Sequence, residues 1–174
     1  MNKKFIKRLK HIKVLALDVD GVLTDGKIVL DSKGSEIKQF DVQDGFGLVL
    51  LKKAGLKTAI ISARSSSALS ARAQDLNIDK VYQDAFPKVH AYDNLLKELG
   101  LRDENVCFLG DDLPDLGIFR RAGCAVAVAN ACQELKKEAH YVTKKFGGYG
   151  AVREVVEMIL KAQGLWGTIL KGYY

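Results

Sequence analysis

The chain has 174 residues, enough for one domain with a sizeable core, and its 48 % hydrophobic and 28 % charged residues are typical of a globular protein. The formal charge of +6 is spread along the chain, without zinc-finger spacing or the aromatic signature of an RNA-binding module. No apolar run reaches the length of a membrane span, and the basic N-terminus lacks the apolar stretch of a signal peptide. The three cysteines show no CxxC spacing, so we expect reduced thiols in a cytoplasmic protein with no membrane or nucleic-acid partner.

The first predicted element is a strand over residues 13–19, an apolar run without polar alternation that is typical of a strand buried on both faces. A β-hairpin follows over about residues 27–41, with its turn at Asp31-Ser32-Lys33-Gly34. The next segment, 44–55, reads as a helix for which Asp44 is the expected N-cap.

Strands and helices then alternate to the end of the chain, apart from an apolar and aromatic tail over residues 164–174 that we expect either to dock on a neighbouring subunit or to fray. The predicted strands are 56–62, 81–83, 105–110, 124–130 and 141–143, and the predicted helices are 65–77, 87–100, 114–123, 132–139 and 150–163. This alternation predicts one α/β domain spanning 1–174, a Rossmann-like three-layer α/β/α sandwich with a central parallel sheet and the hairpin as its only insertion.

Chemically active side chains follow the predicted strands where each strand ends. They are Asp18 and Asp20 after the first strand, Ser62 and Arg64 after the second, Lys88 at the start of the next helix, and Asp111, Asp112 and Asp115 after "VCFLG". Ligands of open parallel sheets bind beyond the carboxyl ends of the strands, so we expect these groups to face one crevice.

Several carboxylates in one crevice repel each other unless a cation or protons neutralise them, and carboxylate oxygens suit Mg²⁺. We therefore predict a magnesium-dependent phosphoryl-transfer site. Asp18 would bind the metal and attack phosphorus, while Asp20 would protonate the leaving oxygen. Asp111 would complete the metal site, and Lys88 and the Ser62 hydroxyl would hold the phosphoryl oxygens.

Each of these features has a simpler interpretation when taken alone. Paired acids often cap turns or begin helices, Ser62 could be a helix N-cap, and Lys88 could be an exposed lysine on an amphipathic helix. The joint occurrence of all of them at successive strand ends favours the active-site interpretation.

These segments resemble the haloacid dehalogenase superfamily of phosphohydrolases. The motifs that carry the resemblance are "VLALDVDGVLTD", "AIIS", Lys88 and "VCFLGDDLPD". The resemblance implies that Asp18 forms an aspartyl-phosphate and that Asp20 is the general acid/base and offers its backbone carbonyl to Mg²⁺. It also implies phosphate binding by Ser62 and Lys88 and metal binding by Asp111, with Asp112 and Asp115 in support.

A finer resemblance is to the branch of this superfamily that lacks a mobile cap domain and hydrolyses the sugar-acid ester 3-deoxy-D-manno-octulosonate 8-phosphate, a lipopolysaccharide precursor. The segments "DVDGVLTDGKIVL", "FPKVHAYDNLLKELGL" and "GGYGAVREVVEMIL" carry it, although Tyr149 stands where Arg is usual. It implies a homotetramer whose hairpins and neighbouring chains close the site. Arg64 would bind the substrate carboxylate, a geometry that suits a guanidinium, and Thr24 is a second candidate for substrate binding.

Two other interpretations stay open at this point. A related branch acts on nine-carbon sialic-acid-type 9-phosphates and tends to carry Glu at the position of Arg64, so Arg64 favours the octulosonate ester. A non-catalytic module of the same fold would not need Asp18, Asp20, Lys88 and Asp111 all intact.

Overall fold

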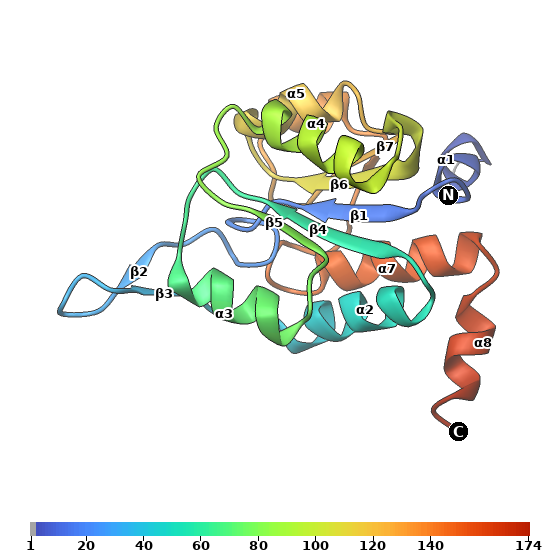
Figure 1. Cartoon of the computed structure of the whole chain (residues 1–174), viewed down its shortest axis with the longest axis horizontal. Coiled ribbons are helices and arrows are strands. Elements are labelled where there is room, and N and C mark those ends of the chain that lie inside the picture. The colour runs from blue at the N-terminus through green and yellow to red at the C-terminus, as the bar shows by residue number, and fades with distance from the viewer. Residues whose placement is uncertain (1–2) are drawn as a thin grey trace.

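The computed structural model describes residues 3–174, which form a three-layer α/β/α sandwich around a parallel sheet (Figure 1). The six strands lie in the order β5-β4-β1-β6-β7-β8 and are all parallel. They are β1 (Val14–Leu17), β4 (Lys57–Ile61), β5 (Lys80–Tyr82), β6 (Val106–Gly110), β7 (Cys124–Ala127) and β8 (Tyr141–Val142). The fold class predicted from the sequence is confirmed.

The position of β1 in the sheet explains where a ligand site can form. The chain leaves β1 to build β4 and β5 on one side, and returns to place β6, β7 and β8 on the other. The strand order therefore reverses beside β1, and open sheets of this kind bind ligands in the crevice at such a switch point. Every residue of β1 and β6 is buried, as their uninterrupted apolar runs predict.

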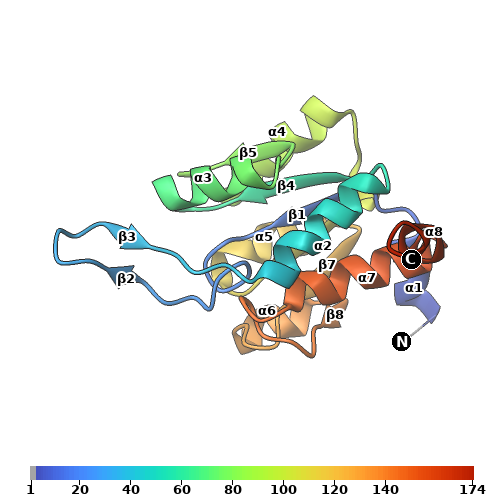
Figure 2. The same ribbon diagram turned by 90° about the horizontal axis from the view of Figure 1, so that it is seen from below.

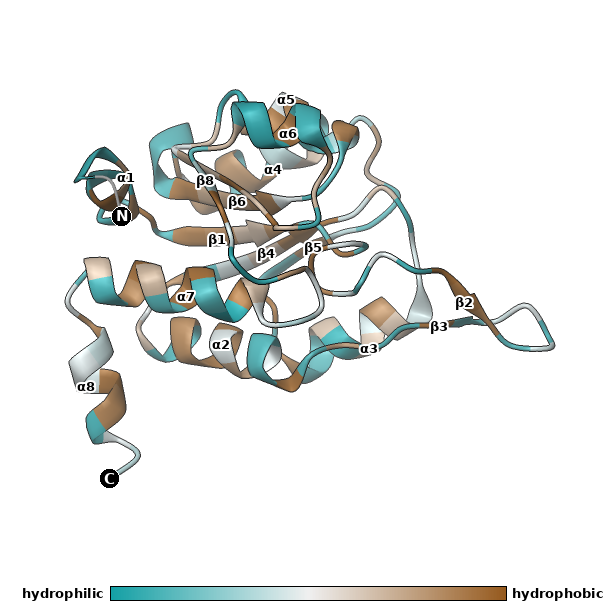
Figure 3. Ribbon diagram, turned by 180° about the vertical axis from the view of Figure 1, so that it is seen from behind, coloured by the Kyte–Doolittle hydropathy of each residue, from teal (hydrophilic) through white to brown (hydrophobic). Residues whose placement is uncertain are grey.

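Helices cover both faces of the sheet. In Figures 1 and 3, α4 (Lys88–Leu99) and α5 (Leu116–Phe119) lie on one face, and α2 (Val42–Lys53) and α7 (Ala151–Ala162) on the other. The shorter helices are α1 (Lys3–Leu9), α3 (Ser67–Asp75), α6 (Gln133–Glu138) and α8 (Trp166–Lys171), and two 3₁₀ turns, η1 (Asp103–Asn105) and η2 (Leu113–Asp115), flank β6. None of the helices in the described part of the chain is both long and apolar enough to cross a bilayer.

A β-hairpin is the only insertion between β1 and α2, and it extends away from the body of the molecule (Figure 2). Its strands, β2 (Val29–Leu30) and β3 (Glu36–Ile37), form a separate antiparallel pair. Asp31 Oδ1 accepts hydrogen bonds from the N–H groups of Lys33 and Ser35, both at 2.8 Å, and so closes the predicted turn. Within residues 3–174 no segment forms a cap domain over the strand ends.

Three details differ from the sequence-based expectations. Helix α1 was not anticipated, because its basic residues obscure the apolar pair Phe5 and Leu9 that it buries. The tail forms helix α8, and its Tyr173 packs edge-on against Phe46 of α2. The expectation that Asp44 caps its own helix is wrong: α2 begins at Val42, and Asp41 is the N-cap, accepting from the N–H groups two and three residues on.

Candidate active site

Three carboxylates meet where β1 and β6 end. Asp18 directly follows β1, and its backbone N–H donates to Leu109 O at 3.0 Å, which fixes it against β6. Asp111 directly follows β6, and Asp115 ends the 3₁₀ turn η2. One carboxylate oxygen from each of these acids lies within 4.8 Å of the other two. The sequence-based expectation that acids from separate strand ends share one crevice therefore agrees with the geometry.

Lys88 supplies a positive charge to this cluster. Its Nζ lies 2.7 Å from Asp18 Oδ1 and 2.7 Å from Asp115 Oδ1, and the side chain is buried. Burial alone would lower the pKa of the ammonium, but the charges of Asp18 and Asp115 raise it above its ordinary value. Lys88 thus stays charged, and the interpretation of it as an exposed surface lysine is wrong.

One ammonium does not neutralise three carboxylates, and the excess negative charge contributes to the raised pKa values of Asp111 and Asp115. Burial, followed by the charges of Asp18 and Asp115, raises the pKa of Asp111 to about 8. Burial and the charge of Asp18 raise the pKa of Asp115 to about 6. A site that disfavours its own ionised carboxylates while offering only oxygen ligands fits a hard divalent cation such as Mg²⁺. Asp18, Asp111 and Asp115 are the side chains placed to hold it.

Asp20 lies at the edge of the acid cluster, and its carboxylate is paired with two cations. Lys38 Nζ, from the segment after β3, contacts Asp20 Oδ1, and Arg64 Nε lies 3.7 Å from Asp20 Oδ2. Glu36 joins the same two cations, at 3.0 Å from Lys38 Nζ and 3.2 Å from Arg64 Nη2. The Asp20 side chain is thus separate from the three clustered acids, and metal binding through its backbone carbonyl stays a prediction.

Ser62 and Thr24 are both buried, but they make different contacts. Ser62 follows β4 beside β1, and its Oγ accepts from the Arg64 N–H at 3.2 Å. It is not a helix N-cap, because Ser66 caps α3. The Thr24 hydroxyl bonds to the backbone of its own loop, accepting from Gly21 N–H and donating to Val19 O. Its role in substrate binding therefore stays a prediction.

The two remaining predicted residues lie outside the acid cluster. Asp112 is exposed, and its N–H donates to Asp115 Oδ2 at 3.4 Å. Arg64 has 47 % of its side chain exposed, which leaves the guanidinium accessible to a ligand at the mouth of the site. Binding of a substrate carboxylate by Arg64 stays a prediction.

Lys38 is the residue that the sequence analysis missed. Only 3 % of its side chain is exposed, and it brings the hairpin into contact with Asp20. A signal was available: Glu36 and Lys38 flank Ile37 with the period of two that places alternate strand residues on one face. Ile37 is exposed, as this alternation requires.

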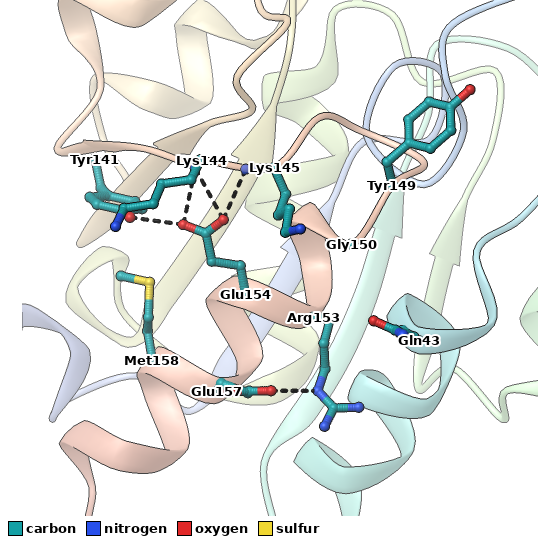
Figure 4. Close-up of a pocket in the computed structure, with 10 residues that line it drawn as sticks. All are labelled: Gln43, Tyr141, Lys144, Lys145, Tyr149, Gly150, Arg153, Glu154, Glu157 and Met158. Carbon is teal, nitrogen blue, oxygen red and sulfur yellow. Dashed lines mark hydrogen bonds and ion pairs between the residues drawn. The ribbon is translucent and has the colours of Figure 1, made fainter.

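A separate hollow of about 610 Å³ lies beside the start of α7, lined among others by Tyr149, Gly150 and Arg153 (Figure 4). Within it, Glu154 accepts hydrogen bonds from the Tyr141 hydroxyl and from two backbone N–H groups of the segment before α7. None of the side chains predicted for catalysis lines this hollow.

Comparison with known proteins indicates a phosphohydrolase, the class of enzyme that the acid cluster also suggests. A family of haloacid dehalogenase-like hydrolases matches residues 77–154. The 3-deoxy-D-manno-octulosonate 8-phosphate phosphatase KdsC of Yersinia pestis is 44 % identical over 158 residues, covering 91 % of this chain and 84 % of that protein. The chain belongs to this phosphatase family. KdsC of Escherichia coli K12 is 42 % identical over 159 residues, covering 91 % of this chain and 85 % of that protein.

A solved structure of the octulosonate phosphatase family matches the whole chain. The enzyme from Moraxella catarrhalis, crystallised with magnesium ion, phosphate ion and KDO, superposes with a TM-score of 0.97 at 42 % identity, and each chain is covered completely. The match over the full length agrees with the haloacid dehalogenase superfamily membership that the motifs predicted. Only the β-hairpin lies between β1 and α2, and no segment within residues 3–174 forms a cap.

Proposed function

We propose that the protein is a Mg²⁺-dependent phosphatase that hydrolyses 3-deoxy-D-manno-octulosonate 8-phosphate, a phosphoric monoester of a sugar acid. The observation that carries this proposal is the cluster of Asp18, Asp111 and Asp115 around the buried ammonium of Lys88. Kinship with enzymes named for this ester supports the choice of substrate.

In the proposed reaction, a carboxylate oxygen of Asp18 attacks phosphorus, the ester P–O bond breaks, and Asp20 gives its proton to the departing sugar oxygen. Asp20 then takes a proton from the water that attacks the aspartyl-phosphate, which releases inorganic phosphate and restores Asp18. Lys88 and Ser62 hold phosphoryl oxygens. When bound, Mg²⁺ supplies positive charge that offsets the charge developing on the phosphoryl group.

The choice of sugar acid depends in this proposal on Arg64. Its guanidinium is half-exposed at the mouth of the site and is held by single contacts to Asp20 and Glu36. A carboxylate can be bound by two parallel N–H groups of a guanidinium, so a sugar acid would be recognised by the end that does not react.

A homotetramer is part of the proposal, supported by the apolar surface of the hairpin. Ile28, Leu30 and Ile37 expose 56 %, 59 % and 48 % of their surface, and β2 is brown in the hydropathy view of Figure 3. Exposed apolar residues grouped on one projecting element mark an interaction surface, and a second copy of this chain is the partner that the family resemblance implies.

We further propose that the chain acts as one hydrolase domain over residues 1–174 and works in the cytoplasm. Cys107 and Cys124 are register partners on β6 and β7, and both are free thiols. Neighbouring unlinked cysteines are expected in a reducing compartment.

A substrate panel tests the proposed function. The purified protein is assayed for phosphate release from the octulosonate ester, a nine-carbon sialic-acid-type 9-phosphate and p-nitrophenyl phosphate, with Mg²⁺ and with a chelator. We expect the highest kcat/KM with the octulosonate ester and loss of turnover in chelator. Asp18→Asn should abolish release from every ester. Equal kcat/KM for all three esters would refute the substrate assignment, and full activity of Asp18→Asn would refute the covalent mechanism.

A further inference from the structure

The loop that follows the candidate nucleophile Asp18 packs backbone against backbone on the loop that precedes α7. Gly148 N–H, from the segment before α7, donates to Val22 O at 2.9 Å. A Cβ on Gly147 would lie 1.7 Å from Gly21 O, and a Cβ on Gly148 would lie 2.6 Å from the carbonyl carbon of Thr24. Side chains are therefore impossible at Gly147 and Gly148 unless one of the two loops moves.

Asn130 links the same two loops through its side chain. Its Oδ1 accepts from Gly147 N–H at 2.7 Å, and its Nδ2 donates to Gly21 O at 3.4 Å. On its other side, the loop after Asp18 meets the acid cluster, because a Cβ on Gly21 would lie 2.0 Å from Asp111 Oδ2. This loop is consequently clamped between the acids and the Gly147–Gly148 segment.

A buried carboxylate from another helix binds the backbone that directly follows the Gly147–Gly148 segment. Asp44, on α2, accepts from Gly150 N–H at 3.2 Å and from Arg153 N–H at 2.7 Å, and only 1 % of its surface is exposed. Gly150 has φ +94° and no side chain with which to cap α7. The first turn of α7 is thus capped across the helix pair, which ties both this turn and the loop before it to α2.

We propose that Asp44 is a positioning residue for the phosphatase reaction: by capping α7 it holds Gly147–Gly148 against the loop that carries Asp20 and the backbone N–H groups after Asp18. This inference rests on the proposed function, and it adds a residue that contacts neither the acid cluster nor the substrate. Burial raises the pKa of Asp44 to about 6, so the ionised carboxylate carries a desolvation cost in the folded protein.

The test compares Asp44→Ala and Asp44→Asn with Asp79→Ala. Asp79 is the control, because it also accepts a backbone N–H, that of Thr58 at 3.0 Å, but it lies at the amino ends of β4 and β5, the end of the sheet away from the acid cluster. For each protein, kcat and KM are measured with p-nitrophenyl phosphate and with the octulosonate ester, and hydrogen exchange is followed in the peptide covering residues 19–25.

We expect Asp44→Ala to lower kcat by about tenfold or more with both esters while KM changes little, since misplacing reacting groups by about 1 Å can cost a hundredfold in rate. Exchange over 19–25 should be faster in this variant. Asp44→Asn, which keeps one acceptor, should fall between Asp44→Ala and wild type, and Asp79→Ala should match wild type in both measurements.

The proposal is overturned if Asp44→Ala keeps the wild-type kcat and exchange, or if Asp79→Ala changes both as much. Should Asp44→Ala not fold, Asp44→Asn carries the test of Asp44, and Gly148→Ala, which perturbs the contact between the two loops directly, is expected to give the same lowered kcat and faster exchange. If the wild-type protein hydrolyses neither ester, the proposed function is wrong, and exchange over 19–25 still decides whether Asp44 orders the loop.

Discussion

Replacing Lys88 with Met should destabilise the protein strongly and in a way that depends on magnesium. At 2.7 Å and an effective dielectric constant of about 20, each of its two ion pairs carries a Coulomb attraction of about 6 kcal/mol before the cost of dehydration is subtracted. Truncating one partner of a buried ion pair typically costs about 3–5 kcal/mol, because the other charges stay buried without compensation. In a protein of this size, that loss lowers Tm by about 6–20 °C.

The assay is thermal unfolding followed by circular dichroism, in chelator and in saturating Mg²⁺. The Tm deficit of Lys88→Met should be largest in chelator, since Asp18, Asp111 and Asp115 then repel each other without a cation. A divalent ion bound by these acids restores positive charge, so the deficit should shrink with Mg²⁺. Activity should remain low in both conditions, because the ammonium proposed to hold the phosphoryl oxygens is gone.

Lys97→Met is the matched control, an exposed lysine on the same helix α4, and it should change stability by no more than about 0.5 kcal/mol. The reasoning is refuted if Lys88→Met has the same Tm as Lys97→Met, or if its Tm deficit relative to wild type is the same with and without Mg²⁺. The second result would mean that the three acids do not bind the ion.

Three further predictions follow from other contacts. Gly21→Ala places a Cβ 2.0 Å from Asp111 Oδ2, so the Mg²⁺ concentration for half-maximal activity should rise about 10–100-fold. Gly34→Ala, with nothing within 4 Å of its Cβ, should leave this concentration unchanged. Equal values for the two variants would contradict the prediction. Burial raises the pKa of Asp44 from 3.8 to about 6, so ionising Asp44 destabilises the folded protein; this loss of stability is absent below pH 3.8 and complete once the pH has risen through 6. The free energy of unfolding of Asp44→Asn, measured with urea, should therefore rise by about 3 kcal/mol relative to that of wild type between these two pH values. A difference that stays constant with pH would refute this. Leu30→Asp should dissociate the proposed homotetramer, lowering the sedimentation coefficient without lowering the Tm of the subunit, and an unchanged sedimentation coefficient would exclude the hairpin as the interface.

The sheet and its helices could be predicted from the sequence because the physics that forms them is local. Strand β1 is an apolar run without alternation, which is the pattern of a strand covered on both faces, and Gly100 ends α4 in the left-handed conformation expected of a glycine after a helix. Helix α1 was missed because only Phe5 and Leu9 face the core over its two turns, and the basic residues between them conceal the pattern.

The site was predictable where strand ends decide it and unpredictable where packing between distant elements decides it. The meeting of Asp18 and Asp111 follows from two parallel neighbouring strands ending at one edge. Asp115 was expected only to support the site, since a 3₁₀ turn has to bend back before its carboxylate can join theirs. Asp44 was misassigned because its sequence neighbours offer a plausible helix cap, whereas its partners lie more than a hundred residues away.

The hairpin cannot be trimmed as a dispensable surface loop. Lys38 reaches Asp20 from it, while Ile37 beside it faces outward. Neighbouring positions on this hairpin are therefore constrained differently: Lys38 by its ion pair with Asp20, the proposed general acid, and Ile37 by its exposure on the outer face. Removing an odd number of residues from one strand of the hairpin would move every following side chain to the opposite face. A shortened or grafted hairpin must therefore keep the in-out alternation of its residues as well as their composition.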